Sequence, residues 1–263
     1  MINSMQSAII RKDIRFTTKN KGLLTGLIVV PLVFTVIFPA MFILIAHFVP
    51  EDLGDFQELI DLMPPIQTSD SLSRAVMALI IDFIMPTFFM VVPVIAASTM
   101  AAGSFVGEKE KRTLETLLYC PLSLRKIFET KVLASFLLSM VVTLASFVVM
   151  QIVVQTLLLL TTGSMMLPGL SWPVTVLVVS PAVSLLAITL IVGGSAKAKT
   201  MEESFQRSAF MIVPVVFLAV SQLSGVVLIS AWYLLGFGVI LAVIAAILLK
   251  RSMRKYTYEA LLR

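Results

Sequence analysis

The longest uncharged stretch constrains this chain more than any other feature, because residues 132–196 include no formally charged side chain. A helix that crosses the ~30 Å hydrocarbon core of a bilayer needs about 20 apolar residues, so one tilted helix cannot use the whole stretch. Residues 161–164 interrupt it with turn-forming side chains, and Trp172 follows where an interfacial aromatic is expected. The stretch therefore predicts two membrane spans, at about 132–159 and 173–195.

Shorter apolar runs fill most of the remaining chain. Hydrophobic residues make up 59% of the sequence, more than the roughly 45–50% of an ordinary soluble domain. No segment between the runs reaches the ~50 residues at the small end of an independent domain. We therefore expect an all-α integral membrane protein, with a single domain over residues 1–263 and six spans. The other four spans are predicted at about 23–47, 76–104, 206–222 and 233–249.

The positions of the basic residues predict the orientation of the spans. All but one of the 20 basic residues lie in four segments, 1–22, 107–131, 197–207 and 250–263. Because basic residues accumulate on the cytosolic side, these segments and both termini are expected inside, and 250–263 forms a basic cytosolic tail. Apolar residues at helical spacing, such as Met5 and Ile9, predict that 1–22 is an interfacial helix on the inner leaflet. The expected location is the plasma membrane, as a multi-pass protein.

Residues 107–131, between the second and third predicted spans, form the most densely charged segment of the chain. Oppositely charged residues four apart, such as Lys111 and Glu115, support an amphipathic helix. Pro121 ends this helix, and Ser123 is placed to cap a second helix that continues into the third span. The segment therefore predicts a helical elbow on the cytosolic surface of the membrane.

Several kinds of chemistry lack the residues that they require. The phosphate-binding pattern Gly-x-x-x-x-Gly-Lys-Ser/Thr does not occur, and residues 194–200 have the right residue types at the wrong spacing. A single His and a single Cys cannot form a metal cluster, and no catalytic residues are predicted. The basic residues border apolar runs, so nucleic acid is not an expected partner. The chain is therefore expected to bind no ATP, metal or cofactor itself and not to be an enzyme on its own.

Five residues within the predicted spans are candidates for lining a transport pathway: Asp82, Pro86, Pro93, Gln151 and Gln155. Asp82, the one charge inside a span, either contacts a cation or substrate in a polar cavity or lies high enough to reach interfacial water. The two prolines predict a bent second span, which either lines a pathway or only packs and bends. The two glutamines either line a pathway or hydrogen-bond across helices.

The elbow reads EKEKRTLETLL over residues 108–118 and is followed by Pro121, Ser123 and Lys131. This pattern resembles the hallmark of type-2 ABC transporter permeases. Arg112 stands where glycine is common in that family, and Thr130 replaces the glycine that usually precedes the lysine. The six-span plan, the basic amino-terminal segment and the short cytosolic loops extend the resemblance over the whole chain.

The resemblance implies a permease that works with two separate ABC ATPase subunits, which bind ATP and Mg²⁺, and with a second permease copy or a sister permease. The elbow would dock into the ATPase and transmit its closure to the spans. Residues 223–233 correspond to an outer segment that is often re-entrant in the family. The coupling residues implied by the resemblance are Glu108, Glu110, Arg112, Thr113, Glu115, Leu117, Leu118 and Pro121.

The expected function is therefore that of the transmembrane permease subunit of an ABC exporter, which forms the substrate pathway and works by alternating access. Uniformly apolar spans favour a hydrophobic or amphipathic cargo. The alternative is an ATP-driven sodium efflux permease, with Asp82 as its charged contact, because residues 197–204 are similar to a loop of the sodium-exporter branch. An alternative of another class is a self-sufficient secondary transporter or a membrane scaffold.

Overall fold

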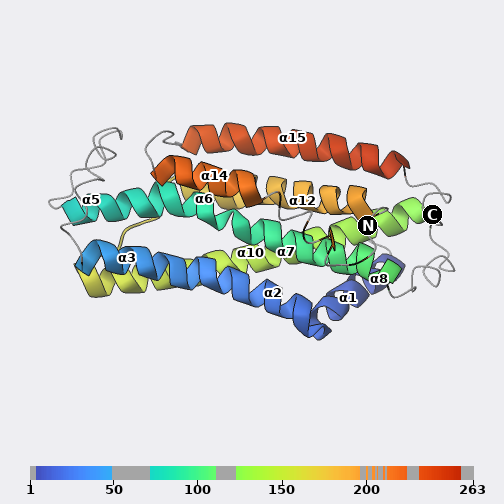
Figure 1. Ribbon diagram of the computed structural model, residues 1–263, viewed down its shortest axis with the longest axis horizontal. Coiled ribbons are helices and arrows are strands. Elements are labelled where there is room, and N and C mark those ends of the chain that lie inside the picture. The colour runs from blue at the N-terminus through green and yellow to red at the C-terminus, as the bar shows by residue number, and fades with distance from the viewer. Residues whose placement is uncertain are drawn as a thin grey trace.

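The computed structural model describes residues 4–48, 72–110, 123–195, 200, 203, 204, 206, 210, 212–223 and 231–255. Over these residues the chain is helical and contains no strand, which confirms the expected all-α fold. The long helices run roughly along the length of an elongated bundle (Figure 1). α1 (Ser4–Lys19), α8 (Gly107–Glu110) and the last turns of α15 (Ala231–Lys255) lie at the same end of it.

Among the described residues, five helical segments are long and apolar enough to cross a membrane, and each coincides with a predicted span. They are Lys21–Phe48, Val76–Val106, Arg125–Thr162, Ser171–Gly194 and Ala231–Ser252. The remaining predicted span, 206–222, is described mainly as α14 (Ile212–Leu223). Its 12 residues reach about 18 Å at 1.5 Å each, so a sixth crossing stays a prediction. The proposed re-entrant segment at 223–233 lies largely outside the described residues.

Most spans consist of several helical pieces, in which η marks a π-helical turn. The first contains α2 (Lys21–Leu32), η1 (Val33–Ile37) and α3 (Phe38–Phe48). The second contains α5 (Leu72–Leu79), η3 (Ile80–Ile84), α6 (Met85–Phe89), α7 (Val91–Ala101) and η4 (Ala102–Val106), and it leads into α8. The third is α10 (Leu124–Thr162), and the fourth contains α11 (Ser171–Val174), η5 (Thr175–Val179) and α12 (Ser180–Ser195).

Three of the four π-helical turns in the described helices lie directly ahead of a proline. Proline has no N–H, and its ring collides with the carbonyl four residues earlier. That carbonyl belongs to the middle residue of the π turn in each case: Thr35 for Pro39, Asp82 for Pro86 and Leu177 for Pro181. The chain thus widens one turn where a regular helix would be interrupted. At Pro86, where a bent second span is predicted, the structure has such a π turn.

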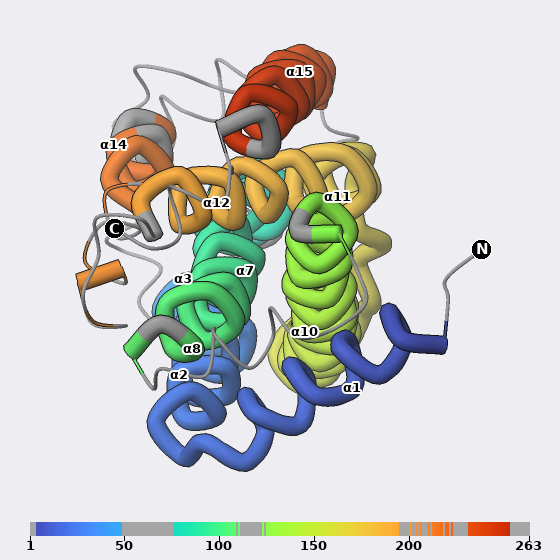
Figure 2. The backbone as a smooth tube through the Cα atoms, turned by 90° about the vertical axis from the view of Figure 1, so that its right-hand side faces the viewer, coloured from blue at the N-terminus to red at the C-terminus, as the bar shows by residue number. Residues whose placement is uncertain are grey.

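The second span forms the centre of the bundle. Of its apolar window, 78% is buried, compared with 22% for the first span and 17% for the last. α7 packs against α2, α10 and α12, as the end-on view in Figure 2 shows. Ala97 and Ala101 are fully buried at these contacts, where small side chains let helices approach closely. Pro93 is also buried within α7.

Two local predictions differ from the structure. Trp172 does not face the surroundings of the bundle but is fully buried, with its ring packed against Phe89 and Phe147. Ser123 occupies the N-cap position of α10, yet its side chain makes no capping hydrogen bond. α10 begins at Leu124 and continues into the third span, as predicted for the helix that follows Ser123, and its 39 residues extend about 58 Å, nearly twice the hydrocarbon core.

Candidate functional site

α1 crosses the ends of the spans at the end of the bundle from which the elbow leaves (Figures 1 and 2). The chain turns from α1 into α2 at Asn20, whose side-chain oxygen accepts hydrogen bonds from the amides of Gly22 at 3.1 Å and Leu23 at 3.5 Å. This capping satisfies amides that the first turn of α2 cannot pair by itself. The sharp turn brings α1 against α10 and η4.

A buried set of polar side chains joins these helices, and we call it the inner ionic cluster. It consists of Asp13 from α1, Ser104 from η4, Glu108 from α8 and Lys131 from α10. Their side chains approach from four separate segments of the sequence. Lys12, also from α1, closes the cluster at its rim.

Lys131 is the centre of this cluster. Its Nζ lies 2.7 Å from Oε2 of Glu108 and 3.8 Å from Oδ2 of Asp13. It donates a hydrogen bond to the carbonyl oxygen of Ser104 at 2.6 Å, and the Ser104 hydroxyl donates to Oδ2 of Asp13 at 2.6 Å. Lys12 Nζ donates to the other oxygen of Glu108. Two carboxylates are therefore held by two ammonium groups.

The cluster is almost completely removed from solvent. The side chains of Asp13, Glu108 and Lys131 are at most 9% exposed, whereas 48% of the Lys12 side chain is exposed. Aromatic rings complete the wall, since Lys131 Nζ lies 5.6 Å from the centre of the Phe105 ring. Removing one member of such a buried ion pair costs about 3–5 kcal/mol, because the partner charge is left without compensation. The cluster thus holds α1, α8 and α10 in one arrangement.

Burial raises the pKa of the Asp13 carboxyl above its ordinary value. The nearby charge of Glu108 acts in the same direction. The ammonium of Lys131, the Ser104 hydrogen bond and Lys12 oppose it without cancelling the effect of burial. The Asp13 carboxyl is consequently easier to protonate than an ordinary aspartate.

The structure places the predicted coupling residues unevenly. Glu108 points into the bundle as part of the inner ionic cluster, and Glu110 is exposed one half-turn further along α8. The other six predicted coupling residues, Arg112, Thr113, Glu115, Leu117, Leu118 and Pro121, lie outside the described residues. Their contact with an ATPase stays a prediction.

Asp82, a predicted pathway residue, binds the backbone at the opposite end of the bundle. Its Oδ1 accepts a hydrogen bond from the amide of Gly169 at 2.7 Å. Any side chain at position 169 would collide with it, because a Cβ there would lie 2.9 Å from the carboxylate atoms. Asp82 therefore fixes the segment that joins α10 to α11.

Trp172 makes a second contact between that region and η3. Within the π turn, the amide of Met85 donates to the carbonyl of Ile80, so the carbonyl of Ile81 would pair next with Pro86. Pro86 has no N–H to give. The indole N–H of Trp172 donates to this Ile81 carbonyl at 3.0 Å instead. A tryptophan side chain thus supplies the hydrogen bond that the proline cannot.

Gln155, another predicted pathway residue, also holds the segment between α10 and α11. Its amide nitrogen donates to the carbonyl oxygen of Met166, and its amide oxygen accepts from the Met166 N–H at 3.3 Å. Gln151, one turn earlier, is half-buried, and Pro86 and Pro93 are buried in the packed second span. Asp82 and Gln155 thus both hold the segment that joins α10 to α11.

The sequence reasoning missed Asp13 and Ser104. Asp13 carried one signal, since it is the only acidic residue in the basic segment 1–22. Ser104 carried none, because it lies among small residues that looked suited only to packing. Within the described ranges, no three His, Cys, Asp or Glu side chains gather closely enough to hold a metal ion.

Comparison with known families agrees with this architecture. The sequence matches the family described as ABC-2 family transporter protein over residues 7–234. That match covers α1, the inner ionic cluster, the elbow and the first helical turn of α15. No curated protein matches the chain. The chain therefore belongs to the ABC-2 family of transporter proteins and is the membrane-spanning component of an ABC transporter.

Proposed function

We propose that this chain is the permease subunit of an ATP-driven exporter in the plasma membrane. Two partner ATPase subunits bind ATP and Mg²⁺, and a second permease copy or a sister permease completes the substrate pathway. Both termini are cytosolic. The cargo is hydrophobic or amphipathic, in keeping with spans that are apolar throughout. Permeases of the ABC-2 family work with ATPase partners.

One observation carries the coupling part of this proposal. Glu108, in the first turn of the elbow, is buried and paired with Lys12 on one side and Lys131 on the other. A displacement of the elbow therefore acts on α1 and on the first turns of α10 together, because separating these charges costs free energy. In this scheme Glu110, Glu115 and their neighbours contact the ATPase, and Glu108 passes the movement inward.

The described contacts of Asp82 lend no support to sodium as the cargo. Its carboxylate accepts a hydrogen bond from the Gly169 amide, a contact that holds the backbone between α10 and α11. Membership of a family of permeases likewise leaves the secondary transporter and the scaffold without a supporting observation.

The proposal is tested by purifying the chain with its candidate ATPase and reconstituting the complex into vesicles. Glu110→Ala combined with Glu115→Ala should weaken complex formation, measured as the Kd of the ATPase for the permease. Glu108→Gln should leave the complex intact but reduce the uptake of an amphipathic fluorescent dye into inverted vesicles per ATP hydrolysed. Arg125→Gln, which alters an exposed ion pair with Glu129, is the matched control.

Two results would contradict the proposal. One is the failure of every candidate ATPase to form a stable complex with the wild-type chain. The other is ATP hydrolysis and complex formation that ignore both the elbow variants and Glu108→Gln. Vesicles loaded for radioactive sodium uptake provide a parallel measurement, in which we expect no ATP-dependent sodium movement.

A further inference from the structure

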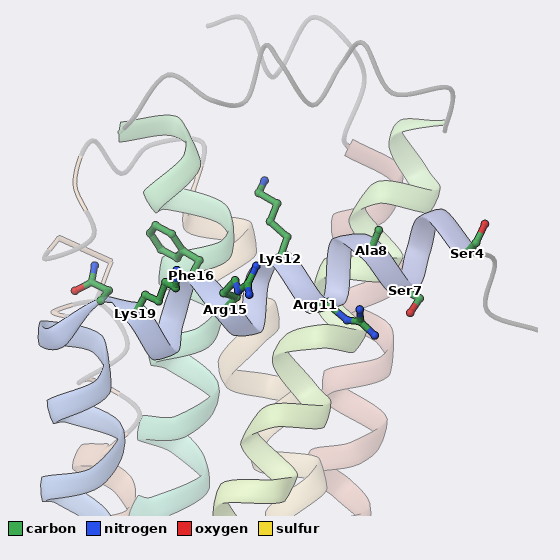
Figure 3. A pocket seen from close by; sticks show the side chains of 9 residues that line it. Ser4, Ser7, Ala8, Arg11, Lys12, Arg15, Phe16 and Lys19 are labelled. Atoms are coloured by element: carbon green, nitrogen blue, oxygen red, sulfur yellow. The ribbon is translucent and has the colours of Figure 1, made fainter.

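A groove of about 910 Å³ runs along one side of α1 (Figure 3). Of the described residues that line it, four are basic and none is acidic. Lys12 extends away from the spans in this view, whereas Arg11 lies on the opposite side of the helix axis. The lining residues are Ser4, Ser7, Ala8, Arg11, Lys12, Arg15, Phe16, Lys19 and Asn20.

The opposite face of α1 packs against the bundle, and this packing determines which way the basic side of the helix faces. Ile9, Asp13 and Thr17 recur every four residues and form the buried face of α1. Arg11 and Arg15 lie away from this buried face, and both are exposed. The arginines are therefore presented by a helix that the inner ionic cluster holds in place, across the ends of the membrane spans.

We propose that this groove binds the phosphate headgroup of an anionic phospholipid from the cytosolic leaflet. Guanidinium groups donate paired hydrogen bonds to phosphate oxygens, and the Ser4 and Ser7 hydroxyls add further donors. Phe16 and Ala8 give the groove an apolar part, which suits the glycerol and the first acyl carbons of a lipid. The groove also lies beside Lys21, the first residue of a span. Neither this position nor the apolar part of the groove would strengthen the binding of a soluble polyanion.

Lys12 connects this groove to the elbow. Its side chain lines the groove and, through Nζ, also donates to Glu108 of the inner ionic cluster. A phosphate bound beside Lys12 competes with Glu108 for the same ammonium group. A bound lipid would then weaken the ion pair between Lys12 and Glu108 and change how the elbow is held. This regulatory step rests on the proposed coupling function, whereas the binding step does not.

Lipid binding is measured on the purified full chain in nanodiscs, without any ATPase. Spin-labelled phosphatidylglycerol and spin-labelled phosphatidylcholine report the relative association of the two headgroups with the protein. We expect a preference for phosphatidylglycerol that falls about fivefold for each arginine removed in Arg11→Gln and Arg15→Gln. Lys250→Gln with Arg251→Gln removes the same charge from the end of α15 and should keep the preference.

Other results overturn the binding proposal. It is wrong if the groove variant keeps the full preference, or if the α15 control loses it equally, which would indicate only general surface charge. Displacement of the lipid by inorganic phosphate at equal concentration would assign the groove to a free anion. Weaker ATPase binding by the groove variant, with an unchanged lipid preference, would assign it to a protein contact. Arg11→Lys with Arg15→Lys controls for folding and should retain most of the preference.

The regulatory step needs the complex with its ATPase. We expect phosphatidylglycerol to change the ATP hydrolysis rate of the wild-type complex severalfold relative to phosphatidylcholine alone, and Lys12→Gln to abolish that response. A response that survives Lys12→Gln would overturn the link between groove and elbow. If no ATPase binds the chain, the proposed function is wrong. The headgroup preference of the isolated chain still shows whether the groove binds anionic lipid.

Discussion

The ammonium nitrogen of Lys131 lies 2.7 Å from Oε2 of Glu108, and this contact ties the foot of α10 to the first turn of the elbow. Glu108 and Lys131 stand near the two ends of the predicted elbow in the sequence, and this contact joins them. Asp13 of α1 lies 3.8 Å from the same ammonium group. Three segments that are far apart in the sequence are thus fixed relative to one another at the base of the elbow.

Lys131→Met should destabilise the protein strongly. The substitution removes a buried cation that lies beside both Glu108 and Asp13, so we expect a loss of about 3–5 kcal/mol. The measurement is the unfolding free energy in mixed micelles. Arg125→Met breaks the exposed pair with Glu129 and should cost at most about 1 kcal/mol.

A neutral version of the cluster distinguishes lost charge balance from lost packing. Asp13→Asn, Glu108→Gln and Lys131→Met together remove every buried charge and should recover most of the stability lost by Lys131→Met alone. If the triple variant is as unstable as the single one, the cluster contributes through shape and not through its charges.

Asp13 should make the stability depend on pH in a definite direction. Burial raises the folded pKa of Asp13 above its ordinary value of 3.8, so the folded protein keeps this proton to higher pH than the unfolded chain does. The resulting stabilisation is complete below 3.8 and is lost as the pH rises through the folded pKa. Asp13→Asn carries no such proton, so its stability should change less between roughly pH 4 and pH 7.

Thermal unfolding midpoints across that range test the effect. Glu129→Gln, which alters an exposed carboxylate on α10, should leave the wild-type slope unchanged. A wild-type midpoint that instead rises with pH, relative to Asp13→Asn, would show that Lys131 outweighs burial at Asp13.

The spans and the bend of the second span could be predicted because their causes are local. The length of an apolar run decides whether a helix can cross a bilayer, and Pro86 removes a backbone donor wherever it stands. The inner ionic cluster could not be predicted in this way. Asp13 meets Ser104 across 91 positions, and the meeting depends on how sharply the chain turns at Asn20.

The contacts of Asp82 and Trp172 could not be predicted for a different reason. Asp82 was identified as a polar residue inside a span, but its partner is the backbone amide of Gly169, which carries no side-chain signal. Trp172 likewise donates to a backbone carbonyl that only the π turn leaves without a donor. Sequence patterns describe side chains well, whereas these contacts depend on which backbone groups the fold leaves unpaired.

Gln155 offers a test of whether the predicted pathway residues line a pathway or support the segment that joins α10 to α11. Gln155→Leu removes two hydrogen bonds to Met166 and should lower the unfolding free energy by about 1–3 kcal/mol. Thr156→Val is the matched control, because its exposed hydroxyl bonds only to its own helix at Ile152. Unchanged stability with an altered rate or selectivity of dye transport would favour the pathway role.

Trp172 and Pro86 should be energetically coupled through the carbonyl of Ile81. Trp172→Phe keeps an aromatic ring beside Phe89 but removes the indole donor, so a buried carbonyl is left unpaired at a cost of about 1–3 kcal/mol. In a Pro86→Ala background the new amide N–H can serve that carbonyl, because it occupies the position from which the π pattern donates. The cost of Trp172→Phe should then fall by at least about 0.5 kcal/mol.

A double-mutant cycle on the unfolding free energy measures this coupling directly. Trp232→Phe, at a tryptophan that is 74% exposed, should change stability by less than about 0.5 kcal/mol in either background. Additive effects of Trp172→Phe and Pro86→Ala would mean that the indole N–H does not replace the missing proline donor. A favourable coupling would show that Trp172 supplies the hydrogen bond that Pro86 cannot give to the carbonyl of Ile81.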